Sequence, residues 1–179
     1  MRCSRQAGFT LVELMVIVAI IAILMAMAAP LLQRSVASSR LTSKTNDMVL
    51  SLKMARSEAA RTGLPVAIRS NVDTHIFSFG WEVYSNPAGD GAARESGVNA
   101  LQVVEAALGQ VNIVRVALDD GAYVAWTGAN PQSLVFNARG RTTPSYFLVC
   151  SGISGAPGRI VAVNAVGKVS VAPQQGMCS

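Results

Sequence analysis

The sequence is poor in the residues from which most metal and catalytic sites are built. Its 179 residues include one histidine, His75, and three cysteines without a Cys-x-x-Cys pair, so a zinc site has no ligand set. Nothing in the sequence marks a nucleophile or an orienting group that would work with His75. Gly167-Lys168 resembles the end of a phosphate-binding loop but lacks its first glycine and the Ser or Thr after the lysine. We therefore predict a protein that is not an enzyme and uses no cofactor.

Charged residues are also scarce, at 14% of the chain, and they are rarest near the N-terminus. An apolar segment there extends to Leu32 with Glu13 as its one charge. As a helix, Phe9 to Ala29 would be about 30 Å long, enough to cross the hydrocarbon core of a bilayer. An ionisable group inside such a span costs a few kcal/mol on insertion scales and usually has a partner or a function. Glu13 is therefore the first candidate functional residue.

A short basic stretch precedes the apolar segment and predicts its orientation. Arg2 and Arg5 favour a cytoplasmic N-terminus, so the chain after Pro30 would lie across the membrane. Pro30 removes a backbone donor and clashes one turn back, which predicts a kink with helix continuing beyond it. The formal charge is +5 at pH 7, and loss of the two arginines would leave +3. That charge is too small to indicate nucleic-acid binding by composition alone.

The most specific motif is GFTLVEL at residues 8–14. A secretory signal has its cleavage site after the apolar region, whereas this chain has a glycine before it. The arrangement resembles the class III signal of type IV pilins and type II secretion pseudopilins. The resemblance implies that residues 1–8 are a leader, and that a prepilin peptidase cuts between Gly8 and Phe9 and N-methylates Phe9.

The same resemblance implies roles for two residues of the apolar helix. Glu13 would pair with the N-terminal amine of a neighbouring subunit during assembly, and Pro30 would be the kink proline of the family. The alternative is a plain membrane anchor whose Glu13 lies near the lipid headgroups.

Residues 9–32 would form the transmembrane and assembly segment, and residues 33–63 the amphipathic half of the same helix. Apolar residues recur on one face of this second half: Leu41, Met48, Leu52, Ala55 and Ala59. Basic residues occupy much of the remainder: Arg34, Arg40, Lys44, Lys53, Arg56 and Arg61. We expect the apolar face to pack on a following sheet with the charges solvated; a membrane surface or an acidic partner is the alternative. Gly63 and Pro65 predict where the helix ends.

Residues 64–179 have the pattern of an antiparallel sheet domain, with β-branched and aromatic runs separated by Gly, Asn, Asp and Pro. We predict strands at 66–70, 76–84, 101–105, 112–118, 123–126, 133–136, 146–150, 159–164 and 168–171. Residues 85–99 predict a long exposed loop, and residues 119–121 and 165–167 predict tight hairpins. The predicted fold class is α+β: a long kinked N-terminal helix packed on an antiparallel β-sheet head, which is also the pilin-like architecture.

Four motifs in this head narrow the resemblance: FNARG at 136–140, YFLVC at 146–150, RIVAVN at 159–164 and GKV at 167–169. They resemble the GspH/FimT branch of minor pilins and pseudopilins, and the terminal Cys178 favours a FimU/FimT-type minor pilin. The resemblance implies partnership with other minor pilins and with the major pilin or pseudopilin, in a complex that primes pilus assembly and lies at the tip. The implied location is the bacterial inner membrane, crossed once with the head in the periplasm, and then the pilus tip. A minor pseudopilin of a type II secretion system, in a periplasmic pseudopilus, is the alternative.

The cysteines give a second indication of compartment. Cys3 would be lost with the leader, which leaves Cys150 and Cys178 in a segment predicted to lie outside the cytoplasm, where disulfides persist. A bond between them would hold the final strand against the sheet. Two unpaired buried thiols are the alternative.

The FimT side of this branch is associated with DNA capture during natural transformation. Arg139 and Arg141 lie in a predicted loop, and Arg159 and Lys168 near strand ends, so together they would neutralise backbone phosphates. The DNA-binding members resembled here carry Arg-x-Arg after the C-terminal glycine, whereas this chain has KVS at 168–170. DNA is thus an alternative partner, against the simpler interpretation of solvated turn charges.

Overall fold

The computed structural model describes residues 10–106, 111–120, 122–126, 128, 130–153, 158–174 and 178. The chain forms two compact units whose division, between Val36 and Ala37, lies inside one long helix. The predicted leader, Cys3, the cleavage site and Phe9 lie outside the described residues. Their roles therefore stay predictions.

Helix α1 (Leu11–Thr62) has a recognisable signal at each end. At its start, the backbone N–H of Glu13 donates to Thr10 Oγ1 at 3.2 Å, and the Thr-x-x-Glu spacing is that of a capping box. At its end, Gly63 has a φ of 70° and donates its N–H to the Ala59 carbonyl at 3.0 Å. The helix continues through Pro30, as predicted, while the kink itself stays a prediction.

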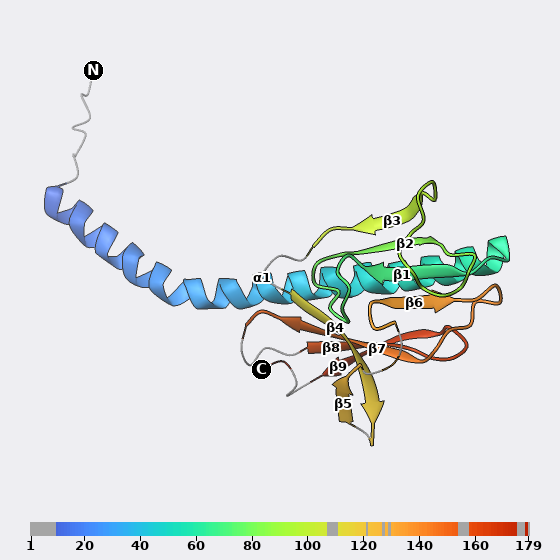
Figure 1. The fold of residues 1–179 in the computed structure, drawn as a ribbon. Coiled ribbons are helices and arrows are strands. Elements are labelled where there is room, and N and C mark those ends of the chain that lie inside the picture. Colours follow the sequence, from blue (N-terminus) through green and yellow to red (C-terminus); the bar gives the residue numbers. More distant parts are fainter. Residues whose placement is uncertain are drawn as a thin grey trace. The chain divides into compact units, whose positions relative to one another are not determined.

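The head contains two antiparallel sheets (Figure 1). The first has the order β3-β2-β1-β6 and is formed by β1 (Val66–Ser70), β2 (Trp81–Ser85), β3 (Ala100–Val104) and β6 (Ser133–Phe136). The second has the order β5-β4-β7-β8-β9 and is formed by β4 (Val111–Asp119), β5 (Ala122–Ala125), β7 (Ser145–Ser151), β8 (Gly158–Val163) and β9 (Val169–Gln174). Strands occur in all nine predicted segments, and the α+β, pilin-like fold class is confirmed.

The predicted strand over residues 76–84 is wrong in its first half. Ile76 makes an isolated bridge to Val114 of the second sheet, whereas β2, in the first sheet, begins at Trp81. Between them the chain turns at Gly80, which has a φ of 89° and whose added Cβ would lie 2.4 Å from a backbone oxygen of β3. A pattern that is continuous in the sequence is therefore divided between two sheets.

The predicted turns and loop agree with the structure. Asp119 pairs with Ala122 across the β4–β5 hairpin, and Gly167 has a φ of 76° in the β8–β9 turn. Between β2 and β3, the connection at residues 86–99 is mostly exposed, apart from the buried Asn86 and Gly91.

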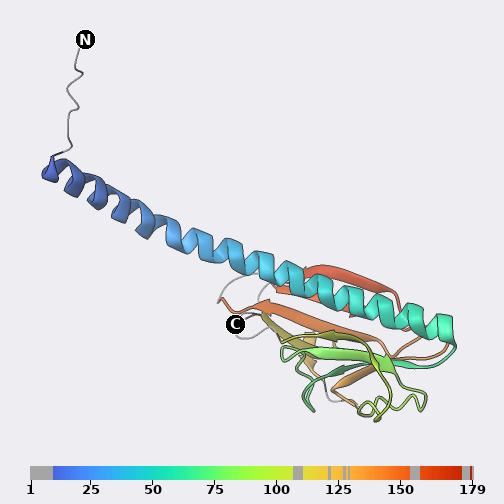
Figure 2. The same cartoon turned by 90° about the horizontal axis from the view of Figure 1, so that it is seen from above.

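The core lies between the part of α1 after residue 37 and the two sheets, which run alongside it in Figure 2. Buried residues of both sheets share one cluster with the five predicted apolar residues of α1, Leu41, Met48, Leu52, Ala55 and Ala59. The expected packing of this helix face on the sheets is confirmed. Burial of a side chain the size of Leu or Met contributes roughly 1.5–3 kcal/mol, so the face binds the helix firmly to the head.

Candidate functional site

The first part of α1 exposes its apolar side chains. The most apolar 18 residues of the helix have a mean hydropathy of 2.9, and none of them is buried. The helix is therefore long and apolar enough to cross a membrane. Such a surface is stable only when lipid or another apolar surface covers it. Glu13 lies in the first turn of this segment. Among the described residues, no side chain pairs with its carboxylate.

The structure contains the predicted disulfide between Cys150, on β7, and Cys178. The bond crosses over Gly158 at the start of β8, where an added Cβ would lie 2.3 Å from the Sγ of Cys178 and 3.0 Å from the carbonyl oxygen of Val149. Only glycine leaves room for the bond there.

One detail of the disulfide prediction needs correction. Strand β9 pairs with β8 along its whole length, from Val169 opposite Val163 to Gln174 opposite Gly158. Backbone hydrogen bonds therefore hold the final strand against the sheet without help from Cys178. The disulfide instead fixes Cys178, which lies beyond the end of β9.

Three of the four predicted DNA-contacting residues lie in two turns that pack together. Arg139 and Arg141 belong to the β6–β7 connection, and Lys168 follows Gly167 in the β8–β9 turn. An added Cβ at Gly167 would lie 2.3 Å from the Gly140 carbonyl oxygen, so the backbones of the two turns touch. Their close approach brings the three cations to one end of the head.

A fourth cation, Arg56 of α1, joins them. An added Cβ at Gly140 would lie 3.2 Å from Arg56 Cγ, and one at Gly167 would lie 2.9 Å from its Cδ. We call Arg56, Arg139, Arg141 and Lys168 the basic cluster. Within the described part of the chain, none of the four has an ion-pair partner. The sequence analysis placed Arg56 on the solvated face of the helix. Arg56 is far from both turns along the sequence, so no local pattern indicated the contact.

Arg159, the remaining candidate, is separate from the cluster. It lies at the start of β8, whereas the turn that carries Lys168 follows the end of that strand. Its Nη2 donates to Thr42 Oγ1 of α1 at 3.0 Å, and the side chain is half-buried. A four-residue DNA site that includes Arg159 is therefore not assembled, and DNA binding stays a prediction.

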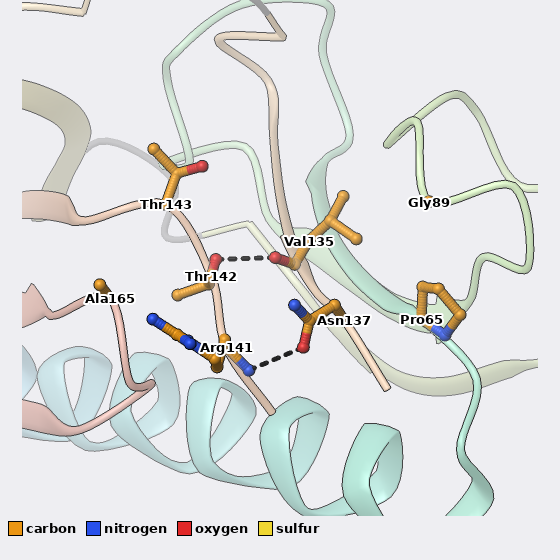
Figure 3. A pocket seen from close by; sticks show the side chains of 8 residues that line it. All are labelled: Pro65, Gly89, Val135, Asn137, Arg141, Thr142, Thr143 and Ala165. Carbon is orange, nitrogen blue, oxygen red and sulfur yellow. Dashed lines mark hydrogen bonds between the residues drawn. The ribbon is translucent and has the colours of Figure 1, made fainter. Parts of the chain in front are cut away.

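A pocket of about 390 Å³ has one member of the basic cluster, Arg141, in its lining (Figure 3). Its lining includes Pro65, Val135, Asn137, Arg141, Thr143 and Ala165. The loop that carries Arg141 is held by Asn137, whose Oδ1 accepts the backbone N–H groups of Arg139 at 3.0 Å and Arg141 at 3.1 Å. A second tie comes from Thr142, whose backbone N–H donates to the Ala165 carbonyl at 3.2 Å. Hydrogen bonds therefore hold the backbone of the loop that lines this side of the pocket.

Sequence reasoning also missed Arg115, a buried cation on β4. The side chain is 2% exposed, and burial lowers the pKa of its guanidinium to about 10. No carboxylate of the described residues pairs with it. The signal was present in the strand pattern, since Val111, Ile113 and Arg115 alternate along β4 and all three point inward.

Comparisons with known proteins agree with this architecture. The family described as "Type II transport protein GspH" matches residues 44–167, and the "Prokaryotic N-terminal methylation motif" matches residues 3–29. A search of curated proteins found no match.

Crystal structures of a minor pilin share the fold at low sequence identity. The type IV minor pilin FimU of Pseudomonas aeruginosa aligns with a TM-score of 0.56 at 17% identity, over 79% of this chain and 96% of FimU. A second crystal form of FimU gives a TM-score of 0.53, also at 17% identity, over 79% of this chain and 98% of FimU. The minor pseudopilin EpsH from the type 2 secretion system of Vibrio cholerae gives 0.47 at 14% identity, over 74% of this chain and 96% of EpsH. Since the GspH match spans more than half of the sequence, the chain belongs to the GspH family.

Proposed function

We propose that the protein is a minor pilin that joins the initiation complex at the tip of a type IV pilus and promotes filament assembly. The observation that carries the proposal is the exposed apolar surface of α1 with one carboxylate in its first turn. Lipid would cover such a surface while the helix is in the membrane, and similar helices of other subunits would cover it in a filament. Membership of the GspH family and the methylation motif support a filament subunit, and FimU, which shares the fold, is itself a type IV minor pilin.

In this proposal, a prepilin peptidase removes residues 1–8 and methylates the new N-terminus at Phe9. The apolar segment stays on the mature chain and anchors it once in the inner membrane, with the head in the periplasm. Other minor pilins and the major pilin then take the place of lipid around the helix.

Glu13 controls the transfer from membrane to filament. The amine of Phe9 in a neighbouring subunit is a cation that becomes costly when lipid and protein exclude water, and the Glu13 carboxylate neutralises it. Removal of Glu13 therefore leaves an unpaired amine in an apolar surrounding.

Substitution of Glu13 tests the proposal. Glu13→Ala should be processed and inserted in the membrane but should be strongly depleted from filaments sheared from the cell surface. Glu58→Ala is the matched control, because Glu58 is a carboxylate on the same helix that pairs with Arg61 at 2.6 Å, outside the apolar segment. Normal recovery of Glu13→Ala in the filaments would contradict the proposal.

The description of the family as type II transport proteins favours a second candidate, a minor pseudopilin. The two functions differ in what deletion of the gene removes. Loss of surface pili with normal protein secretion supports the pilus assignment, whereas retained pili with secreted enzymes trapped in the periplasm would support the pseudopilus.

A further inference from the structure

Among the described residues, the lining of the pocket contains hydrogen-bond donors and no acidic side chain. Arg141 and Thr143 line it, and within the described ranges their side chains have no hydrogen-bond or ion-pair partner. Asn137 uses its Oδ1 to accept two backbone N–H groups, which leaves its Nδ2 free to donate. A concave site with one cation and two neutral donors favours an anionic ligand.

The other walls of the pocket are apolar. Pro65, Val135 and Ala165 contribute aliphatic surface, and Figure 3 shows the Arg141 side chain extending toward Ala165. The volume of about 390 Å³ accommodates a group the size of an amino-acid side chain. An anion on a short methylene stem matches both parts of this lining, since the stem would contact the apolar walls and the charge would reach Arg141.

We infer that this pocket binds the carboxylate side chain of an acidic peptide segment presented by another protein. A guanidinium fork binds a carboxylate through two parallel hydrogen bonds, and a rigid loop presents it without further ordering. The loop is rigid here because backbone hydrogen bonds join it to Asn137 and to the β8–β9 turn.

A nucleic-acid backbone fits this pocket less well. Phosphodiesters are bound by several cations spaced along the strand, whereas one cation lines the pocket among the described residues. Arg139 and Lys168 are exposed and lie outside the lining. The inference goes beyond assembly through Glu13, and it can be tested on unassembled protein.

The test uses full-length mature protein in detergent micelles, with backbone amide NMR signals of residues 137–143 as the measurement. The probe is a blocked pentapeptide, Gly-Ala-Glu-Ala-Gly, and its partner has Gln in place of Glu. We expect the Glu peptide to shift these signals more strongly than the Gln peptide. Arg141→Gln should weaken binding by about tenfold or more, since it removes a charge-assisted hydrogen-bond pair.

Arg139→Gln is the matched control, because it makes the same charge change two residues away, outside the pocket. It should alter the affinity by less than about twofold, as expected for an exposed charge. Thr143→Val removes a donor without changing charge and should weaken binding severalfold, which keeps the test valid if Arg141→Gln fails to fold.

Two results would overturn the inference. One is an absence of shifts with the Glu peptide. The other is binding of a short single-stranded oligonucleotide or of inorganic phosphate in preference to the peptide, with Arg139→Gln as damaging as Arg141→Gln. That pattern would assign the basic cluster to phosphate recognition. Neither result bears on the Glu13→Ala assembly test, so failure of one proposal is distinguishable from failure of the other.

Discussion

The guanidinium carbon of Arg115 lies 3.8 Å from the ring centroid of Trp126, so the buried cation is stacked on an aromatic face. Its Nη1 donates to the carbonyl oxygens of Asn130, at 3.1 Å, and of Ser133. Its Nη2 donates to Ser145 Oγ at 2.9 Å. Because Ser133 is on β6 and Ser145 on β7, one side chain of β4 joins the two sheets of the head.

Arg115→Lys should destabilise the protein markedly. Lysine keeps the buried charge but has one nitrogen where the guanidinium uses two to reach three acceptors, so at least one acceptor loses its donor, and the stacking of the planar group on Trp126 is lost as well. We expect the free energy of unfolding to fall by about 2–4 kcal/mol, measured by urea denaturation of the full-length protein in detergent. Arg159→Lys is the control: among the described residues its half-buried side chain makes one hydrogen bond, to Thr42 Oγ1, so the loss should be about 1 kcal/mol. A smaller loss for Arg115→Lys than for this control would contradict the sheet-joining role.

Tyr84 should make the protein sensitive to alkali. The ring is buried, its hydroxyl donates to the Ala92 carbonyl, and burial raises the pKa of the phenol from 10.0 to about 12. Above pH 10 the unfolded chain therefore loses a proton that the folded protein keeps. The contribution of Tyr84 to the free energy of unfolding should accordingly fall as the pH rises from 10 to 12.

Tyr84→Phe should remove that contribution, while lowering stability at neutral pH by about 1 kcal/mol for the lost hydrogen bond. The buried Arg115, whose pKa is lowered from 12.5 to about 10, opposes this loss, because its contribution to stability rises with pH over the same range. That contribution is common to both proteins, so the measurement is the difference between their urea-unfolding curves at matched pH. A constant difference between the two proteins from pH 10 to 12 would be the contrary result.

Gly158→Ala should prevent closure of the disulfide. The new Cβ would meet Cys178 Sγ at 2.3 Å, so the tail has to move away from Cys150. We expect a loss of roughly 3–4 kcal/mol, similar to that of Cys150→Ser, Cys178→Ser and the double variant, since each removes the same bond. Non-reducing peptide mapping checks the bond, and denaturation checks the loss.

Protease sensitivity provides the control for that prediction. The tail after Gln174 should become cleavable, while β9 should stay protected by its ladder with β8. In the Cys150→Ser/Cys178→Ser background, Gly158→Ala should add a smaller loss, because the bond is already gone. Two alkylatable thiols in unsubstituted periplasmic protein would argue against any role for the disulfide.

Processing should depend on the residue before the cut. The mature protein should begin at N-methylated Phe9, and Gly8→Val should block cleavage by crowding the peptidase site. Ala7→Val adds similar bulk one residue earlier and should be cut normally. Intact mass of filament-associated protein is the measurement, and retention of Met1 in unsubstituted material is the outcome that excludes this pathway.

The sequence by itself determined the features that depend on neighbouring residues. The spacing of Leu41, Met48 and Leu52 predicted the buried face of α1, and Gly63 and Gly167 marked a helix end and a hairpin through their backbone freedom. The disulfide between Cys150 and Cys178 was predicted from the even number of cysteines after the leader and from the predicted compartment.

Only the tertiary structure decided which distant residues meet. In the structure, residues 76–84 are divided between two sheets. Arg56 packs against the turns at Gly140 and Gly167, whereas Arg159 binds Thr42 and lies apart from them. Periodicity and turn residues report the conformation of a few consecutive positions, and they carry no information on which segments pack together. Those contacts arise when the apolar faces of helix and sheets are buried, because burial brings side chains remote in the sequence to one end of the head.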